Sequence, residues 1–188
     1  MNITEKYKAK RSELKTGDII LYSASSTISY WTRIFDNAYF THCGILWRYG
    51  TRVLTMDMWS EGLCVIPASK RISEHLDFAI LRPNVEQDLI DKNIIDSLEL
   101  WEGNVSYDYF MLLRIALQRK LGVDLLRFLG SKKKMICSEF TQWYCNNIGI
   151  YCYKNMELIT PQDFMRYKND QFTVMFDDST PSGNNQTS

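Results

Sequence analysis

Apolar and polar residues alternate over several short runs in the first half of the chain, the pattern of β-strands with one buried face. This pattern predicts strands at 19–22, 41–47, 52–58, 63–67 and 78–82, with a turn at 14–18 and a hairpin turn at 48–51. One further run of this kind, at 172–176, predicts a last strand near the end of the chain. The strands follow one another closely, so most of them are expected to pair antiparallel.

Elsewhere, apolar residues recur at three- and four-residue spacing, which predicts amphipathic helices. These helices are expected at 28–35, 89–101, 109 to about 128, from Cys137 to Asn147 or Gly149, and from about Pro161 onward. Residues 1–13 are polar and form either a short helix or a loose N-terminal arm, and residues 177–188 are expected to be a disordered tail. We therefore predict a single α+β domain at 14–176, an antiparallel sheet packed against helices.

Charge and composition remove several classes of function. The 188 residues carry 22 basic and 22 acidic side chains, so the formal net charge is zero and a nucleic-acid partner is not expected. The basic run at 132–134 is expected to be a solvated loop. No segment approaches the ~20 apolar residues of a membrane helix, so stable membrane insertion is not expected. The charged N-terminus lacks the apolar core of a signal peptide, which predicts a cytoplasmic protein, unless another route delivers it to a cell wall or virion.

The cysteines argue against a disulfide framework and against a structural metal. There are five of them and no CxxC pair: Cys43, Cys64, Cys137, Cys145 and Cys152. An odd number without ligand-type spacing favours small buried thiols in a reduced protein. We expect no metal and no cofactor, and zinc binding is the function that the cysteines favour least.

Cys137 is the candidate nucleophile. It follows apolar Met135 and Ile136 and stands at the start of a predicted helix, where unpaired backbone N–H groups and the helix dipole favour the thiolate. A thiolate of this kind needs a base, and the chain has two histidines. His75 lies in a polar segment and is expected to be exposed, whereas His42 lies in a predicted strand beside a glycine. A lone histidine is more often a core residue than a catalytic one, but with Cys137 present we predict that His42 and Cys137 meet.

A third group would orient the imidazole, and the strand after the hairpin is where it is expected. Thr55 and Asp57 share one face of that strand, and Asp57 is a charged residue inside an apolar run. Asp57 facing His42 would stabilise the imidazolium. The alternative reading is an acid on an edge strand that faces solvent. Thr41 and Thr55 remain open as substitutes for Asp57.

Six segments, in this order, resemble a known family. They are Leu14–Ile20, Thr41–Ile45, Val53–Asp57 with Gly62 and Leu63, Tyr107–Phe110, Ile136–Phe140 and Thr160–Phe164. Together they resemble the circularly permuted branch of the NlpC-type papain-fold superfamily, specifically the YiiX-like cysteine peptidases or amidases. The resemblance extends from residue 14 to about 176. It departs from the family at Cys43, where valine is more usual, and at Asp57, where glutamate is usual.

The resemblance implies a papain-like domain that hydrolyses an amide bond without a cofactor. Cys137 would attack the carbonyl, His42 would take and return the proton, and Asp57 would orient His42. The Cys137 backbone N–H would help to stabilise the oxyanion. Three more residues are candidates for substrate contact: Tyr107, Asp108 and Ser138, although the first two could equally pack the entry to the helix. The substrate would be a small peptide, a peptidoglycan-type or isopeptide amide, or an acyl compound.

Two alternatives use the same fold. The first is acyl transfer of the lecithin retinol acyltransferase type, in which a cysteine becomes acylated by a lipid. Those relatives typically carry a second histidine where this chain has Asp57, and a membrane anchor for which no segment is found here. The second is a binding or structural protein, for example a phage or viral component, that keeps the fold without the chemistry.

Overall fold

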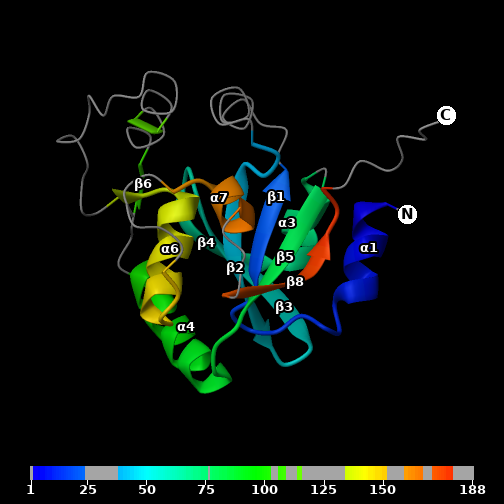
Figure 1. Cartoon of the computed structure of the whole chain (residues 1–188), viewed down its shortest axis with the longest axis horizontal. Helices are drawn as coiled ribbons and strands as arrows, with labels where there is room; N and C mark the ends of the chain where they lie inside the picture. Colours follow the sequence, from blue (N-terminus) through cyan, green and yellow to red (C-terminus); the bar gives the residue numbers. More distant parts are fainter. Residues whose placement is uncertain are drawn as a thin grey trace.

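A six-stranded antiparallel sheet forms the centre of the described part of the chain (Figure 1). The computed structural model describes residues 2–23, 38–75, 77–102, 106–108, 114–115, 134–151, 159–166 and 171–179. The sheet has the order β4-β3-β2-β1-β5-β8. Its strands are β1 (Ile19–Ser23), β2 (His42–Tyr49), β3 (Arg52–Trp59), β4 (Gly62–Pro67), β5 (Asp77–Pro83) and β8 (Phe172–Asp177). All six predicted strands are present, and no strand end is displaced by more than two residues.

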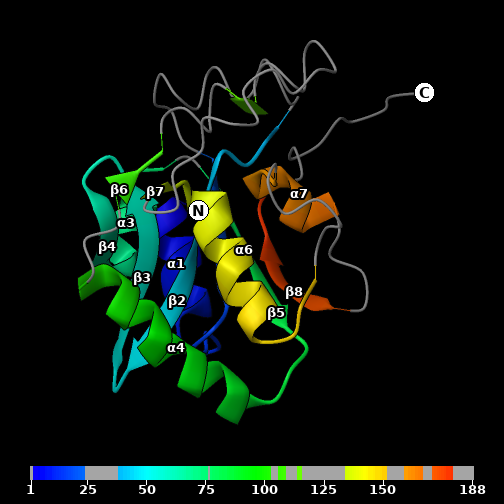
Figure 2. The same ribbon diagram turned by 90° about the vertical axis from the view of Figure 1, so that its left-hand side faces the viewer.

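Helices cover both faces of this sheet, which makes the fold α+β as predicted (Figures 1 and 2). One face carries α4 (Gln87–Glu102), α6 (Cys137–Asn147) and α7 (Pro161–Arg166), and they enclose the larger hydrophobic core with the sheet. The other face carries α1 (Ile3–Lys10) and α3 (Ala68–Ser73), which enclose a second, smaller core. None of the described helices is both long enough and apolar enough to cross a membrane.

The structure also contains elements that the pattern did not predict. Helix α3 has six residues, too few to show a helical period, and follows β4 directly. A pair of two-residue strands, β6 (Ser106–Tyr107) and β7 (Lys134–Met135), forms a separate parallel ladder just before α6. The predicted helix at 28–35 lies outside the described residues, as do most of the helix predicted at 109–128 and residues 180–188 of the tail.

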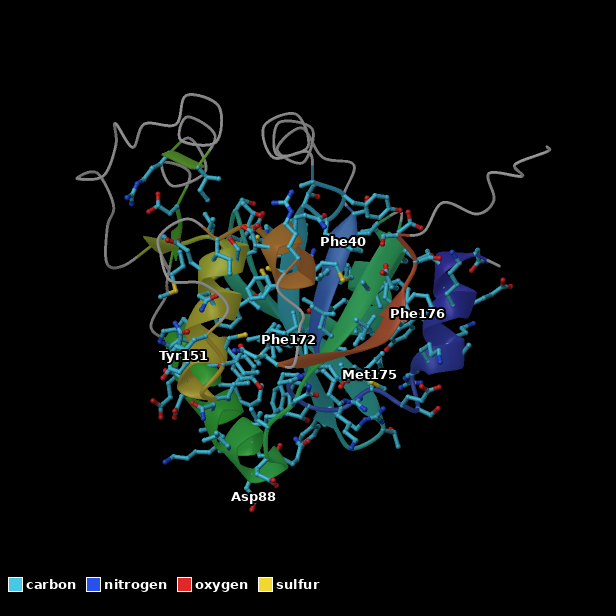
Figure 3. The ribbon with its side chains drawn as sticks, in the orientation of Figure 1. Phe40, Asp88, Tyr151, Phe172, Met175 and Phe176 are labelled. Atoms are coloured by element: carbon cyan, nitrogen blue, oxygen red, sulfur yellow. The ribbon has the colours of Figure 1, made fainter. Side chains whose placement is uncertain are left out.

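The last strand contributes to both cores because its pairing with β5 contains a β-bulge. Leu81 pairs with Val174, but Ile80 pairs with Phe176, so β8 holds one extra residue at this point. An extra residue reverses the side-chain alternation. As a result, Phe172 packs in the larger core, whereas Phe176 stacks on Phe78 in the smaller one at a ring-centroid distance of 4.7 Å (Figure 3).

Gly17 allows two helices to pack against the turn before β1. Its φ is +88°, and a Cβ at this position would lie 2.4 Å from Ile90 Cγ2 of α4 and 2.6 Å from the Tyr144 hydroxyl of α6. A side chain here would therefore strain the backbone and push two buried side chains away. The turn is held further by Asp18, whose carboxylate accepts hydrogen bonds from Arg82 Nε and Nη2 at 2.8 and 2.7 Å.

We expect Gly17→Ala to lower the free energy of unfolding by about 2–4 kcal/mol, since it adds overpacking to an unfavourable φ. Gly50→Ala is the matched control. Gly50 also has a positive φ, +60°, but nothing lies within 4 Å of the Cβ position, so about 1 kcal/mol is expected. Urea unfolding of both variants measures the difference. Equal losses would show that α4 and α6 do not pack on Gly17 in this way.

Candidate functional site

The start of α6 positions Cys137. Cys137 is the first residue of the helix and lies directly after β7 and Ile136. Two side chains of the first turn fix this start: Glu139 Oε2 accepts the Ile136 N–H at 2.9 Å, and the Ser138 hydroxyl donates to the Ile159 carbonyl at 2.7 Å. The first backbone N–H groups of a helix have no acceptor within it, so the Cys137 sulfur lies where negative charge is stabilised.

His42 is the first residue of β2 and lies between Cys137 and Asp57. Its Nε2 is 3.2 Å from Asp57 Oδ2, and its ring lies close enough to Cys137 for the charge of that thiol to raise the pKa of His42. With Nε2 engaged by the carboxylate, Nδ1 is the ring nitrogen left to interact with the sulfur. The structure thus brings together the three residues proposed as nucleophile, base and orienting acid.

Asp57 lies inside the sheet, so the alternative reading of a solvent-facing acid on an edge strand is wrong. Strand β3 is flanked by β2 and β4, and Asp57 is fully buried. A Cβ on Gly44 would lie only 2.8 Å from the Asp57 Cβ and from the Met56 carbonyl oxygen. The missing side chain at Gly44 therefore lets the two strands approach, and the short aspartate reaches His42. Thr55, the substitute on the same face, accepts a hydrogen bond from the Tyr22 hydroxyl at 3.3 Å instead.

The electrostatics of the site favour a thiolate paired with an imidazolium. Although burial opposes it, the charge of Cys137 and the hydrogen bonds with Asp57 and Cys137 raise the pKa of His42 to about 9. The pKa of Cys137 is lowered well below its ordinary value by a hydrogen bond with the Cys43 side chain and by the charge and hydrogen bond of His42. These shifts favour the ion pair, which is lost as the pH rises past about 9, where His42 loses its proton, and as the pH falls through the lowered pKa of Cys137.

Cys43 is a second thiol in contact with the candidate nucleophile, and the sequence analysis did not assign it a role. It points to the opposite face of β2 from His42, into the core beneath α6, where burial raises its pKa. Both residues reach Cys137 because the start of α6 lies at the end of β2. The Thr141 hydroxyl joins the two cysteines: it contacts Cys43 Sγ at 3.3 Å and donates to the Cys137 carbonyl at 3.0 Å.

The prediction that His75 is exposed is wrong. Helix α3 ends just before it and turns the chain inward, so that its ring packs 4.5 Å from the Tyr22 ring and 6.5 Å from the His42 ring. Its Nδ1 is 2.7 Å from the Arg71 carbonyl oxygen. Burial lowers the pKa of His75 to about 4, so this second histidine is neutral at physiological pH. Its side-chain hydrogen bond is to the Arg71 backbone, whereas that of His42 is to the Asp57 carboxylate.

Two residues that contact Asp57 were not predicted from the sequence. The Trp59 indole N–H donates to Asp57 Oδ2 at 2.7 Å, and Arg71 Nε lies 3.1 Å from the same oxygen. Trp59 could have been found, because it follows Asp57 by two positions and so shares its face of the strand. Arg71 could not, because it belongs to the helix that the pattern did not predict.

The residues predicted to contact substrate lie next to Cys137 in the structure. Tyr107 pairs with Met135 through the β6–β7 ladder, and the buried Asp108 donates its backbone N–H to the Met135 carbonyl at 3.2 Å. Ser138 is fully buried and its hydroxyl is engaged by Ile159. Burial, together with the nearby charges of Asp108 and Cys137, raises the pKa of Glu139 to about 7.

Comparisons with known proteins support the fold. No protein-family model and no curated protein matches the sequence. The structure is similar to a solved structure described as the metalloprotein YiiX from Escherichia coli O157:H7, with 15% sequence identity and a TM-score of 0.53. The match covers 86% of this chain and 96% of that chain. The chain therefore has a YiiX-like fold.

The pH dependence of Cys137 alkylation tests the ion pair directly. We expect iodoacetamide to label Cys137 rapidly at pH 6, and His42→Ala to slow this labelling on the order of 100-fold, because an ordinary thiol is almost fully protonated there. Near pH 9 the two rates should converge. Mass spectrometry of the Cys137 peptide follows this residue while the other cysteines stay in place.

His75→Ala is the matched control, since it removes a buried histidine of the same cluster that does not reach the sulfur. It should leave the pH profile of Cys137 unchanged. An ordinary thiol profile in the unsubstituted protein, or the same slowing in both histidine variants, would contradict a specific pair between Cys137 and His42.

Proposed function

We propose that this protein is a cysteine hydrolase that cleaves amide bonds, on a domain of the circularly permuted NlpC-type papain-like kind spanning residues 14–176. The observation that carries the proposal is the position of His42, which contacts the Cys137 sulfur on one side and the Asp57 carboxylate, 3.2 Å away, on the other. A nucleophile, a base and a group that orients the base are the parts that covalent acyl chemistry needs.

In the proposed reaction the Cys137 thiolate attacks the substrate carbonyl and forms a tetrahedral intermediate. The His42 imidazolium then donates its proton to the leaving amine, so the amide C–N bond breaks and a thioester to Cys137 remains. Neutral His42 next takes a proton from water, which attacks the thioester. Collapse of this second intermediate releases the carboxylic acid and the Cys137 thiolate, while the proton taken from water stays on His42, which restores the starting ion pair.

The first turn of α6 supports this chemistry, because it places backbone N–H groups around the sulfur. The negative charge that develops on the substrate oxygen would be stabilised by the Cys137 N–H and by the helix dipole. Asp57 acts at a distance from the substrate. It holds Nε2, keeps Nδ1 toward the sulfur, and stabilises the imidazolium through both steps.

The proposed substrates are small peptides and amides, including peptidoglycan-type and isopeptide bonds. We expect Tyr107 and Asp108 to contribute to their binding, and the backbone pairing of their segment with the entry to α6 supports this. The YiiX structure is described as that of a metalloprotein. In this chain, no three histidine, cysteine or acidic residues among those described are grouped to hold a metal ion, and Asp57 already faces the Arg71 guanidinium. We propose no step through a metal.

A panel of fluorogenic peptidyl and γ-glutamyl amides tests the activity. Cys137→Ala is expected to lower kcat/KM by more than about 1000-fold and His42→Ala by a similar factor, because each removes a group that acts in both steps. Asp57→Asn should lower kcat by roughly 10–1000-fold with little change in KM, because it weakens the imidazolium without touching the substrate. Tyr49→Ala, which removes an exposed side chain at the end of β2 opposite to His42, is the control and should retain full activity.

Hydrolysis by Cys137→Ala at the rate of the unsubstituted protein would contradict the proposal. Two other outcomes identify the alternatives. A stable acyl adduct on Cys137 that passes to added alcohols or amines in preference to water would identify an acyltransferase. An ordinary Cys137 alkylation profile together with no hydrolysis would identify a binding protein that keeps the fold without the chemistry.

A further inference from the structure

Arg71 contacts the candidate site from the opposite side of the sheet from α6. Its side chain extends from α3 toward β3 and is about 10% exposed, and Nε lies 3.1 Å from Asp57 Oδ2. The contact does not have hydrogen-bond geometry, so it is an ion pair between a guanidinium and a fully buried carboxylate. A buried carboxylate is costly unless it is paired, and an arginine is a partner whose charge does not change with pH.

Two further contacts fix the guanidinium in place. Its central carbon lies 4.0 Å from the centroid of the Trp59 ring, and Nη1 is 3.0 Å from Glu74 Oε2. The Trp59 ring, in turn, lies 4.3 Å from the His42 ring and donates its indole N–H to Asp57 Oδ2. Arg71 and Trp59 thus form one packed unit against Asp57 and His42.

All three contacts to the Asp57 carboxylate converge on one oxygen. Oδ2 receives His42 Nε2, Trp59 Nε1 and Arg71 Nε, whereas Oδ1 is buried and has no hydrogen-bond partner among the described residues. The orientation of the carboxylate toward His42 therefore depends on Trp59 and Arg71. Of these two, only Arg71 supplies a charge.

We propose that Arg71 is a positioning residue that holds the buried Asp57 carboxylate aimed at His42 and supplies the positive charge that balances this cluster, and so sustains the Cys137–His42 ion pair in acid. The inference rests on the proposed function of this site. The charges of the four buried groups, the thiolate, imidazolium, carboxylate and guanidinium, sum to zero, and the Glu74 carboxylate at the edge of the cluster is exposed to solvent. Without Arg71, a buried net negative charge would remain, and protonation of the Cys137 thiolate would relieve it as the pH falls. A carboxylate that is no longer held toward His42 would also favour the imidazolium less.

Among the described residues, the other charged and titratable groups around this cluster do not supply a fixed positive charge. His75 is neutral above about pH 4, and Tyr22 is kept protonated because burial raises its pKa. Burial also raises the pKa of Cys64, which pairs with Asp57 across β3 and β4. The groups that face Asp57, His42 or Arg71 from the surrounding elements are Tyr22, Cys43, Glu61, Cys64, Glu74, His75 and Cys137. None of these is an arginine or lysine.

The test compares the pH profile of Cys137 alkylation by iodoacetamide in Arg71→Met, Arg71→Gln and Arg71→Lys. Arg71→Met and Arg71→Gln are expected to slow labelling roughly threefold to tenfold at pH 5.5 and to approach the unsubstituted rate near pH 8. Arg71→Lys keeps the positive charge and should restore most of the labelling rate at pH 5.5. A merely structural role would lower labelling by the same factor at every pH, and lysine would not restore it.

Arg82→Met is the matched control, because it removes an arginine that pairs with another buried aspartate, Asp18, outside the site. It should lower stability and leave the profile unchanged. If Arg71→Met does not fold, the Lys and Gln variants carry the comparison. If Arg71→Gln labels at the unsubstituted rate at pH 5.5, the role proposed for Arg71 is overturned while the proposed function stands. An ordinary thiol profile in the unsubstituted protein would overturn the proposed function itself.

Discussion

The buried charge of Asp57 is the constraint on which the candidate site depends. A carboxylate in the middle of a sheet is stable only when its neighbours compensate it, and here an imidazole, an indole and a guanidinium are gathered around one oxygen. The surroundings follow from this. Gly44 has no side chain, which lets β2 approach β3 closely. Helix α3 places Arg71 beside the Asp57 carboxylate. The charge of Cys137 then acts together with the Asp57 carboxylate to keep the His42 imidazole protonated.

The two halves of the site differ in how far apart their residues lie in the chain. His42, Asp57 and Arg71 belong to consecutive elements, from β2 through α3, so bringing them together closes only short loops. Cys137 comes almost a hundred residues after His42 and joins from the opposite face of the sheet. The cluster of His42, Asp57 and Arg71 therefore forms from neighbouring parts of the chain, whereas the position of Cys137 depends on the packing of α6 against β2.

The sequence predicted the first-order features of this arrangement for physical reasons. Alternation of apolar residues requires a half-buried strand, which is why all six strands of the sheet were placed correctly, and a cysteine before a helical period marked the start of α6. The environment of His75 was not predictable from its polar neighbours, because the short helix before it carries no periodic pattern. The role of Arg71 was not predictable for the same reason, because Arg71 belongs to this short helix. The contact of Cys43 with Cys137 needs the end-on approach of α6 to β2, which strand alternation alone does not reveal.

The bulge in β8 has a consequence for the outer edge of the sheet. An edge strand presents unpaired backbone groups to which a strand of another chain can add. In β8 the extra residue opposite Ile80 and Leu81 interrupts the regular ladder and increases the local twist. The outer side of β8 is thus a poor template for a further strand. The same irregularity that lets one strand fill two cores also guards this edge of the sheet against self-association through β-pairing.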